Sequence, residues 1–197
     1  MRWIAAFVGV AVLSQAQITR QVEGRADSLV QVVIYEDLAC SDCAAFRAML
    51  DAHLLPKFGD TVAFVHRDFP LAKHPWAKDA AVAARWFTSR GQDIGLAFRR
   101  ETLAHLDAIT INTLPDHIKT FARSRGLDGE AAIAALSDPR FREPVERDMR
   151  DGVARGVIHT PTVFVNGKPF VESFPLEDIS TAIQEAIALA KRDGFKP

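Results

Sequence analysis

Two cysteines lie between a buried-strand pattern and an amphipathic-helix pattern, and this junction constrains the fold more than any other feature. Residues 28–36 form a short apolar, β-branched run, which is typical of a central strand covered on both faces. From Cys43 onward, apolar residues recur at spacings of three and four as far as Leu54, which predicts a helix that stops or bends near Pro56. We therefore expect Cys40 at the N-terminus of a helix that follows a buried strand.

Strand and helix patterns alternate in the order of an α/β domain that is interrupted by helices. Residues 61–69 form a second strand pattern and complete a strand-helix-strand unit. Residues 75–156 are instead Ala-rich and have helical periodicity. The helical segments lie near residues 76–90, 92–107, 113–125, 129–137 and 139–155. Asp138-Pro139 predicts an N-cap followed by proline at the first helical position.

The strand pattern returns after these helices. Residues 162–165 are β-branched or aromatic, and Asn166-Gly167 predicts a tight hairpin turn. A last amphipathic helix is predicted over about residues 176–192. The predicted organisation is a signal peptide over 1–16, an α/β domain in two parts over 17–74 and 157–197, and an inserted helical subdomain over 75–156.

The first sixteen residues have the order of a secretory signal. Arg2 precedes an apolar run over residues 3–13, and the small residues Ser14 and Ala16 follow. The run is short for a membrane span, which needs about 20 residues. We expect cleavage near Ala16-Gln17 and a periplasmic or otherwise extracytoplasmic protein. The alternative is an uncleaved anchor or a buried first helix.

Acidic and basic residues nearly cancel, 25 against 24, so that the net charge is −1. A basic excess is the usual mark of binding to nucleic acid or to an acidic membrane surface, and neither partner is expected here. A hydrophobic content of 48% in 197 residues is enough for the core of one domain. Within the predicted helices, Arg47 and Asp51 are expected away from the apolar stripe, and the pair Arg99-Arg100 on a solvated face.

The two cysteines are the chain's only ones, and they enclose Ser41 and Asp42. A thiol attacks only as thiolate, and the unpaired N–H groups of a helix N-terminus lower a thiol's pKa. Cys40 is therefore the predicted nucleophile and Cys43, one helical turn inward, the predicted resolving thiol; this exchange needs no cofactor. The alternatives are an inert disulfide and a zinc site, but zinc takes four ligands, and the chain has neither a second cysteine pair nor histidines at ligand spacing.

A proline before the third strand pattern is the second informative feature. Thr160-Pro161 directly precedes residues 162–165. Because proline cannot donate to a strand ladder, Pro161 is expected at the first position of that strand. His159 lies beside this pair and is a candidate for tuning the active sulfur; the alternative is an ordinary surface-loop histidine.

Three blocks of sequence together resemble the DsbA-like branch of the thioredoxin superfamily. They are residues 35–43, residues 67–71 with His74-Pro75 after them, and residues 160–167. The resemblance runs over about residues 28–192. It implies the α/β class, with a thioredoxin fold that carries an inserted all-helical subdomain.

The resemblance also implies roles and partners. It implies a nucleophilic Cys40, a resolving Cys43 and a cis Pro161, with Thr160 packed against the disulfide and offering its backbone to a substrate peptide. The expected partners are extracytoplasmic proteins that carry thiols or disulfides, and a membrane redox partner that reoxidises the pair.

One departure from the family pattern lies between the cysteines. Strongly oxidising relatives carry a histidine next to the second cysteine, where this chain has Asp42. A carboxylate near the sulfur should disfavour the thiolate, raise the pKa of Cys40 and lower the reduction potential. We therefore expect a disulfide donor weaker than the strongest relatives.

A second departure concerns proton transfer. Many relatives place a buried acid six residues before the first cysteine, where this chain has Ile34. Glu36 and Asp37 are the nearest acids, and proton transfer to Cys43 is expected to use one of them or water. The alternative interpretation is that both are solvated acids at a strand end.

The sequence thus predicts an exported thiol-disulfide oxidoreductase, with its direction left open among donor, reductase and isomerase. Isomerases of this superfamily are typically dimers with an extra segment, whereas about eleven residues separate Ala16 from the first strand pattern, which favours a monomeric oxidase. One rival is a peptide-binding module without turnover. Another is a glutathione-dependent enzyme on a similar scaffold, against which the second cysteine and the export signal argue.

Overall fold

The structure, a computed structural model, describes residues 21–192. The predicted signal peptide and its cleavage site lie outside the described residues. The elements are β1 (Gln21–Gly24), β2 (Gln31–Glu36), α2 (Ser41–Met49), a π-helical turn (Leu50–Leu54), α3 (Leu55–Phe58), β3 (Ala63–Asp68), α4 (Ala77–Arg90), α5 (Gln92–Ala104), α6 (Leu114–Ser124), α7 (Gly129–Ala134), α8 (Pro139–Ala154), β4 (Thr162–Val165), β5 (Lys168–Val171) and α9 (Leu176–Arg192). Short 3₁₀ turns cover Leu106–Ala108 and Ala135–Ser137.

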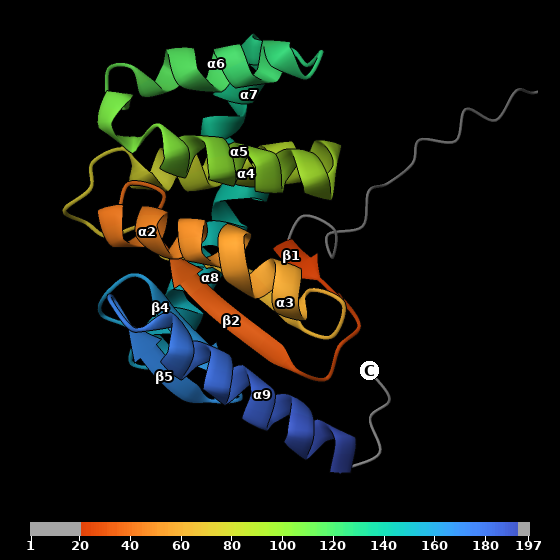
Figure 1. Cartoon of the computed structure of the whole chain (residues 1–197). Coiled ribbons are helices and arrows are strands. Elements are labelled where there is room, and N and C mark those ends of the chain that lie inside the picture. Colours follow the sequence, from red (N-terminus) through yellow and green to blue (C-terminus); the bar gives the residue numbers. More distant parts are fainter. Residues whose placement is uncertain (1–20, 193–197) are drawn as a thin grey trace, which may run out of the picture.

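The five described strands form one mixed sheet in the order β1-β3-β2-β4-β5, with β2 at its centre (Figure 1). β2 and β3 are parallel, as the predicted strand-helix-strand unit requires, and the other neighbours are antiparallel. This mixed α/β architecture confirms the predicted fold class. β1 was not predicted, because Gln-Val-Glu-Gly is too short and too polar to show a strand pattern.

Helices cover both faces of the sheet. On one face, Val32 and Ile34 of β2 pack in a cluster with apolar side chains of α2 and α9. On the other face, Tyr35 packs edge-on against Phe69 and beside Gly152 of α8. Successive side chains of a strand point to opposite faces, so the continuous apolar run of β2 is explained by its cover on both sides.

The helices between residues 77 and 154 follow the predicted segments. α4 to α7 lie together on one side of the molecule, at the top of Figure 1, and α8 leads back behind β2. As predicted, Asp138 caps α8, and its Oδ1 accepts the N–H of Arg140 at 2.9 Å. No helix within residues 21–192 is long and apolar enough to cross a membrane.

Aromatic rings fill the core of these helices. The ring of Phe87 lies 4.7 Å from that of Phe98 and 4.8 Å from that of Phe121 between centroids. The same cluster of buried residues includes Cys40 and Cys43. The cysteines therefore lie where the helical core meets the sheet.

The helix after the cysteines continues past the predicted stop near Pro56. α2 passes into the π-helical turn and then into α3, whose first turn contains Pro56. A proline is tolerated in the first turn of a helix, because the N–H that it lacks has no intrahelical acceptor there. In the π-helical turn, the N–H of Leu55 donates to the carbonyl of Leu50, five residues back, and this is the last such bond before Pro56.

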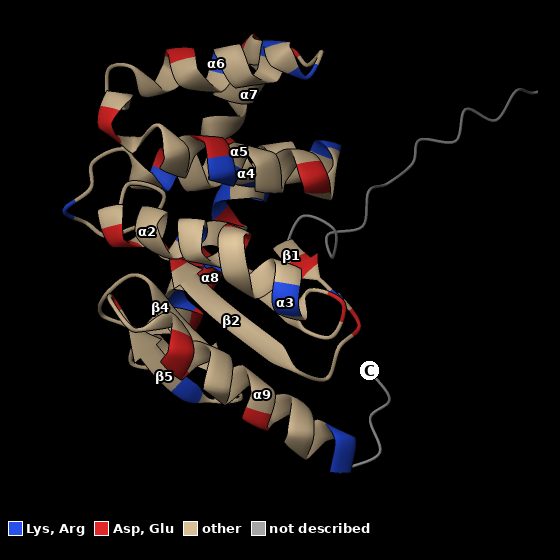
Figure 2. Cartoon of the chain, viewed as in Figure 1, with Lys and Arg blue, Asp and Glu red and all other residues tan. Residues whose placement is uncertain are grey.

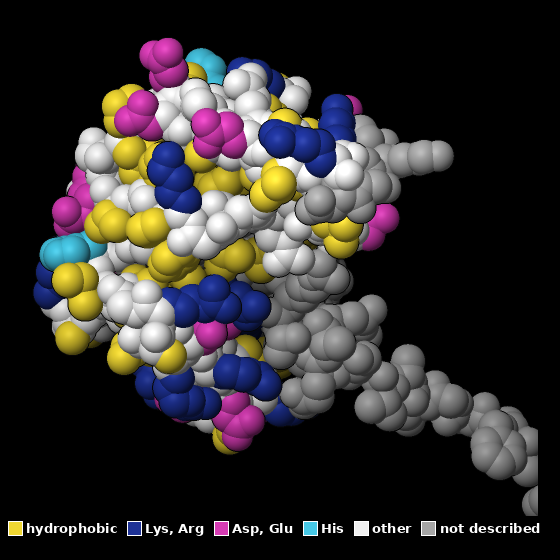
Figure 3. Space-filling view, turned by 90° about the horizontal axis from the view of Figure 1, so that it is seen from below, with side chains coloured by type: hydrophobic (Ala, Val, Ile, Leu, Met, Phe, Trp, Pro, Cys, Tyr) yellow, Lys and Arg dark blue, Asp and Glu magenta, His cyan; other side chains and the backbone are white. Residues whose placement is uncertain are grey.

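The surface carries both signs of charge. On the face seen in Figure 3, Lys and Arg side chains are interspersed with Asp and Glu and with apolar groups. This agrees with the net charge of −1.

Candidate active site

Cys40 caps the N-terminus of α2. Its backbone is extended (φ −103°, ψ 125°), and its carbonyl accepts the N–H of Ala44 at 3.1 Å. Its Sγ lies 3.3 Å from the carbonyl oxygen of Thr160, to which the sulfur donates when it is protonated, and the residue is 6% exposed. The Cys43 thiol contributes most to lowering the pKa of Cys40 to about 5; burial opposes this, and Thr160 and the N–H groups of Cys43 and Asp42 support it. Cys40 is therefore a thiolate at neutral pH.

Cys43 lies one turn further along α2 and is fully buried. The N–H of Asp37 donates to its Sγ at 3.4 Å. Burial raises the pKa of Cys43 well above its usual value, and the neighbouring Cys40 and Glu36 add to the rise. Both thiols are free in this structure. One sulfur is thus ready to attack while the other keeps its proton.

The Thr160-Pro161 peptide bond is cis, as the family resemblance implies. Thr160 is buried, and its carbonyl faces the sulfur of Cys40. On the other side, the carbonyl of Pro161 accepts the N–H of Glu172 at 2.8 Å. The loop before β4 therefore lies against the N-terminus of α2, although 120 residues separate the two in sequence.

Asp37 is buried and organises the loop that carries the cysteines. Its Oδ1 accepts the N–H of Ala39 at 2.7 Å, and its Oδ2 accepts the N–H of Leu71 at 2.8 Å. The same Oδ2 lies 2.7 Å from Nδ1 of His74. Asp37 thereby joins the cysteine loop to the segment after β3, and the interpretation of it as a solvated acid is wrong.

Glu36 is also buried, at the end of an otherwise uncharged β2 (Figure 2). Its Oε1 lies 2.5 Å from Nδ1 of His66 and 3.0 Å from the Arg99 guanidinium. Burial alone would raise the pKa of Glu36, but Arg99 and His66 outweigh it and hold this pKa well below the usual range. Glu36 is therefore ionised at neutral pH and has no proton of its own to donate to Cys43. The interpretation of Glu36 as a solvated acid is wrong, because the residue is buried.

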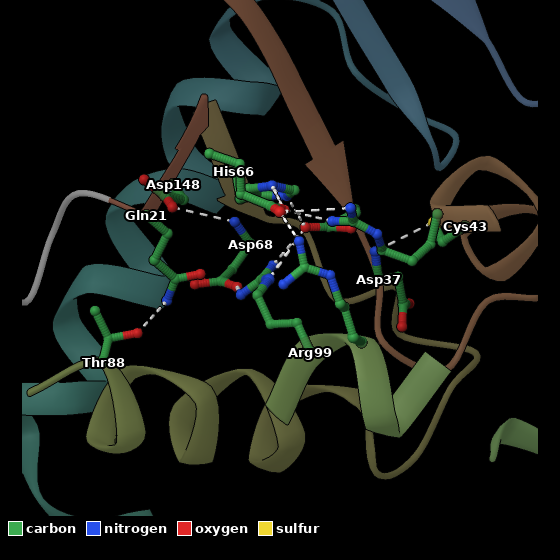
Figure 4. Close-up of polar contacts among 12 residues, drawn as sticks. Gln21, Asp37, Cys43, His66, Asp68, Thr88, Arg99 and Asp148 are labelled. Atoms are coloured by element: carbon green, nitrogen blue, oxygen red, sulfur yellow. Dashed lines mark hydrogen bonds and ion pairs between the residues drawn. The ribbon is translucent and has the colours of Figure 1, made fainter. Parts of the chain in front are cut away.

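A buried network of charges surrounds Glu36 and joins the helical layer to the sheet (Figure 4). Arg99 of α5 donates to Asp68 of β3 at 2.6 Å, and Arg85 of α4 donates to the same carboxylate at 2.5 Å. Arg85 also pairs with Asp148 of α8. These four residues are at most 3% exposed. The expected solvated position of Arg99 is therefore wrong.

Arg47 is a second buried charge beside the site. It is 5% exposed and pairs with Glu23 of β1 and with Asp51. Helical periodicity placed it away from the apolar stripe, but α5 packs on α2, and Glu23 of β1, which was not predicted, pairs with Arg47. The burial of two other residues of the charge network could have been found from the sequence. Asp68 lies at the end of an apolar strand pattern, and Arg85 lies within an Ala-rich helix.

The remaining predicted site residues lie at the surface. Ser41 and Asp42 are exposed. The rise in the pKa of Cys40 that we expected from Asp42 is not observed, because local hydrogen bonds to the sulfur lower this pKa. His159 is about half exposed, and its Nδ1 lies 3.0 Å from a carboxylate oxygen of Glu172. This contact favours the surface-loop interpretation of His159.

The sheet, the inserted helices, the cysteine pair and the cis proline define a thioredoxin fold with a helical insertion. A family model described as thioredoxin matches residues 16–185. This chain belongs to the thioredoxin family. Within residues 21–192, no group of three or more His, Cys, Asp or Glu side chains is arranged to hold a metal ion.

Solved structures share the fold at low sequence identity. The chain is similar to alpha-DsbA1 of Wolbachia pipientis, with a TM-score of 0.76 at 17% identity over 88% of this chain and 94% of that one. It is also similar to BdbD from Bacillus subtilis in its oxidised form, with a TM-score of 0.74 at 21% identity over 86% of this chain and 94% of that one.

Curated relatives are much longer proteins. The Na(+)/H(+) antiporter NhaA of Herminiimonas arsenicoxydans is 32% identical over 168 residues, which cover 84% of this chain and 25% of that protein. The Na(+)/H(+) antiporter NhaA 1 of Mycolicibacterium gilvum is 30% identical over 150 residues, which cover 75% of this chain and 23% of that protein. The chain thus spans about a quarter of the length of the curated relatives it matches.

Proposed function

We propose that this chain is a thiol-disulfide oxidoreductase that exchanges disulfides with proteins outside the cytoplasm. The observation that carries the proposal is the opposite behaviour of two neighbouring thiols. The pKa of Cys40 is lowered to about 5 at a helix N-terminus, whereas burial raises that of Cys43. An attacking thiol must be ionised and reachable, and a resolving thiol must stay protonated until it is needed.

The proposed exchange has two steps. In the oxidising direction, the thiolate of a substrate attacks the sulfur of Cys40 in the Cys40–Cys43 disulfide. A substrate–Cys40 bond forms, the bond between the cysteines breaks, and Cys43 leaves as a thiolate that takes up a proton. A second substrate thiolate then attacks its partner sulfur in the mixed disulfide, and Cys40 leaves as a stable thiolate. Substrate is oxidised, the pair is reduced, and no cofactor takes part.

The loop at Pro161 supports binding of an extended substrate. The carbonyl of Thr160 lies 3.3 Å from the sulfur of Cys40, so a peptide aligned with this loop would bring its own sulfur to Cys40. The loop is held from behind by the N–H of Glu172. A binding module without turnover would use the same loop, and the cysteine variants described below distinguish the two functions.

The proposed direction is disulfide donation, at a strength below that of the strongest relatives. A lower thiolate pKa stabilises the reduced pair and makes the disulfide more oxidising. A pKa of about 5 for Cys40 lies between about 7 for thioredoxin and about 3.5 for DsbA. We further propose export, action as a monomer, and reoxidation by a membrane redox partner. Ion transport is not proposed, since the relatives named for it are about four times as long as this chain.

The proposal is tested by equilibrating the Cys40–Cys43 pair with glutathione buffers, followed by tryptophan fluorescence or by thiol alkylation and mass. A reduction potential well above thioredoxin's value of about −270 mV supports a disulfide donor. A potential near or below that value makes the chain a reductase or isomerase. A pair that never exchanges overturns the proposal. Replacing both cysteines should abolish disulfide transfer but leave peptide binding intact.

A further inference from the structure

Three buried side chains from three neighbouring strands form a triad behind the active site. Nδ1 of His66 lies 2.5 Å from Oε1 of Glu36, and Nε2 of His66 lies 2.8 Å from Oε1 of Glu23. His66 is 1% exposed, Glu36 3% and Glu23 7%. Figure 4 shows His66 among the polar contacts that also include Asp68, Arg99 and Asp148, with the contact between Asp37 and Cys43 beside them.

The two contacts of His66 determine how many protons the triad holds. A neutral imidazole has one N–H group and one lone pair, whereas a carboxylate has only acceptor oxygens. With a single proton, one ring nitrogen would face a carboxylate oxygen with no hydrogen between them. Each contact therefore needs a proton of its own. The triad in this geometry holds two protons, one more than a neutral imidazole with two carboxylates.

The charged groups around the triad come from every element packed against it. Arg47 of α2 and Arg100 of α5 pair with Glu23, and Arg99 of α5 pairs with Glu36. Beyond them, Asp51 contacts Arg47 and Arg100, and Asp68 contacts Arg99. Each carboxylate of the triad thus already has an arginine partner. The arginines favour the ionised form of both carboxylates, so the second proton lies on the imidazole ring and is shared with the carboxylate that it faces.

The triad is linked to the resolving cysteine by position and by charge. Glu36 directly precedes Asp37, whose N–H donates to Cys43 Sγ at 3.4 Å. The negative charge of Glu36 contributes to raising the pKa of Cys43. A proton taken up beside Glu36 reduces the negative charge that Cys43 faces. This makes the Cys43 thiolate easier to form.

We propose that Glu23, His66 and Glu36 share one exchangeable proton, and that this proton controls how readily Cys43 ionises when it resolves a mixed disulfide. The proposal rests on the proposed function. In the resolving step, Cys43 loses its proton to solvent and forms a bond to Cys40. The bond between Cys40 and the substrate breaks, and the substrate sulfur leaves as a thiolate that takes up a proton from solvent. Glu23, His66 and Glu36 act as positioning residues, because none of them touches the reacting sulfurs.

The pH range of the effect follows from the surroundings of His66. Burial lowers the pKa of His66, Glu36 opposes the shift, and Arg47 and Arg99 reinforce it. The shared proton is therefore released on the acid side of an ordinary histidine, below pH 6.5. Below this transition Cys43 faces a triad with two protons, and above it a triad with one.

The first test needs no mutation. Nitrogen and proton NMR of His66 in the reduced wild-type chain, recorded from pH 4.5 to 7.5, should detect a second exchangeable proton in the triad, on the ring or on a carboxylate. That proton should be lost with a midpoint below pH 6.5. A neutral ring with one N–H group and two ionised carboxylates over the whole range would overturn the proposal.

The second test measures the resolving step. Reduced protein is mixed with oxidised glutathione, and release of glutathione from its mixed disulfide with Cys40 is timed from pH 4.5 to 6.5. An isolated thiol gains about tenfold in thiolate per pH unit, which is about a hundredfold over this range. The wild type should gain clearly less, because the triad loses its proton as the pH rises. His66→Gln has no ring nitrogen that can take up the proton. Its rate of glutathione release should therefore show the full hundredfold gain over this range.

A matched control separates the triad from general damage to the interior. Thr88→Val removes the buried hydrogen bond from Gln21 at 3.1 Å but leaves the triad intact, and it should follow the wild-type profile. Parallel profiles for the wild type and His66→Gln would overturn the inference. If His66→Gln does not fold, the NMR titration of the wild type decides. A wild type that releases no glutathione at any pH contradicts the proposed function, while the NMR result still tests the shared proton.

Discussion

Cys40 and Cys43 differ in their surroundings although three positions separate them. Cys40 receives hydrogen bonds from the Cys43 thiol and from N–H groups of the first turn, whereas Cys43 is enclosed by apolar side chains and faces the charge of Glu36. Burial acts on both sulfurs, but at Cys40 the hydrogen bonds outweigh it. The two sulfurs therefore differ in reactivity although they lie only one helical turn apart.

The first prediction concerns the reactivity of Cys40 with pH. Its pKa of about 5 predicts that alkylation by iodoacetamide rises up to about pH 5 to 6 and then levels off. Cys43→Ala should raise the pKa of Cys40, because the Cys43 thiol contributes most to lowering it. Both are read from alkylation rates or thiolate absorbance between pH 3 and 10. A midpoint near 9 in the wild type would contradict the proposed site.

The second prediction concerns Asp42, which is exposed beside both cysteines. Asp42→His removes a negative charge and should lower the pKa of Cys40 by up to about one unit, which makes the disulfide more oxidising. Asp42→Asn removes the charge without adding a basic group and should give a smaller shift in the same direction. Thiolate absorbance and the glutathione equilibrium measure the two effects. A higher pKa of Cys40 in Asp42→His would show that the carboxylate does not act through charge.

At the scale of elements, the inserted helices are joined to the sheet by buried ion pairs as well as by apolar contacts. Arg85 of α4 and Arg99 of α5 meet Asp68 at the end of β3, and all three residues are buried. Removing one partner of a buried pair leaves an uncompensated charge in the interior. The interface is therefore sensitive to single substitutions.

The third prediction follows from this interface. Arg99→Met leaves Glu36 and Asp68 without one of their partners and should lower the free energy of unfolding by about 3–5 kcal/mol. Arg155→Gln removes an exposed pair with Asp151 and should cost about 1 kcal/mol or less. Urea denaturation of the reduced proteins compares the two. Equal midpoints would mean that the buried pairs do not stabilise the interface.

The fourth prediction concerns the packing of α8 on the sheet. A Cβ at Gly152 would lie 2.7 Å from the ring of Phe69 and 3.1 Å from that of Tyr35. Gly152→Ala should therefore destabilise the fold by about 1–3 kcal/mol. Gly91→Ala is the control, since its Cβ would meet only the flexible side chain of Ile94 at 3.3 Å. Thermal unfolding of both variants distinguishes a close-packing effect from a general cost of replacing glycine.

At the scale of the whole molecule, the site lies where three parts of the chain meet. The cysteines come from the start of α2, Asp37 ties them to the segment after β3, and the cis proline loop approaches from before β4. The core of the inserted helices includes both sulfurs. The insertion therefore forms part of the wall of the site.

Sequence periodicity predicted most of this architecture because apolar spacing reports burial directly. The strand before Cys40 and the helical segments follow from it, whereas the hairpin at Asn166-Gly167 follows from its turn residues. It missed β1, whose four residues show no apolar pattern, and so it gave no sign that Arg47 has a buried partner there. Arg99 was misplaced for a related reason: a buried charge is stabilised by partners distant in sequence, which periodicity does not register.

The candidate site was predictable only where it is local in sequence. Cys40 and Cys43 follow from the strand-helix junction, and the proline loop from its position before a strand. The triad of Glu23, His66 and Glu36 draws on three strands, so only the folded chain brings it together.

The most direct test of the account is capture of a mixed disulfide. Cys43→Ser, incubated with a peptide that contains a disulfide, should accumulate a covalent adduct at Cys40, because the resolving thiol is missing. Cys40→Ser should form none, since Cys43 is fully buried. Mass spectrometry of the intact protein and of its fragments locates the adduct. An adduct on Cys40 alone is the predicted result; no adduct in either variant, or equal adducts in both, would contradict the assignment of Cys40 as nucleophile and Cys43 as resolving thiol.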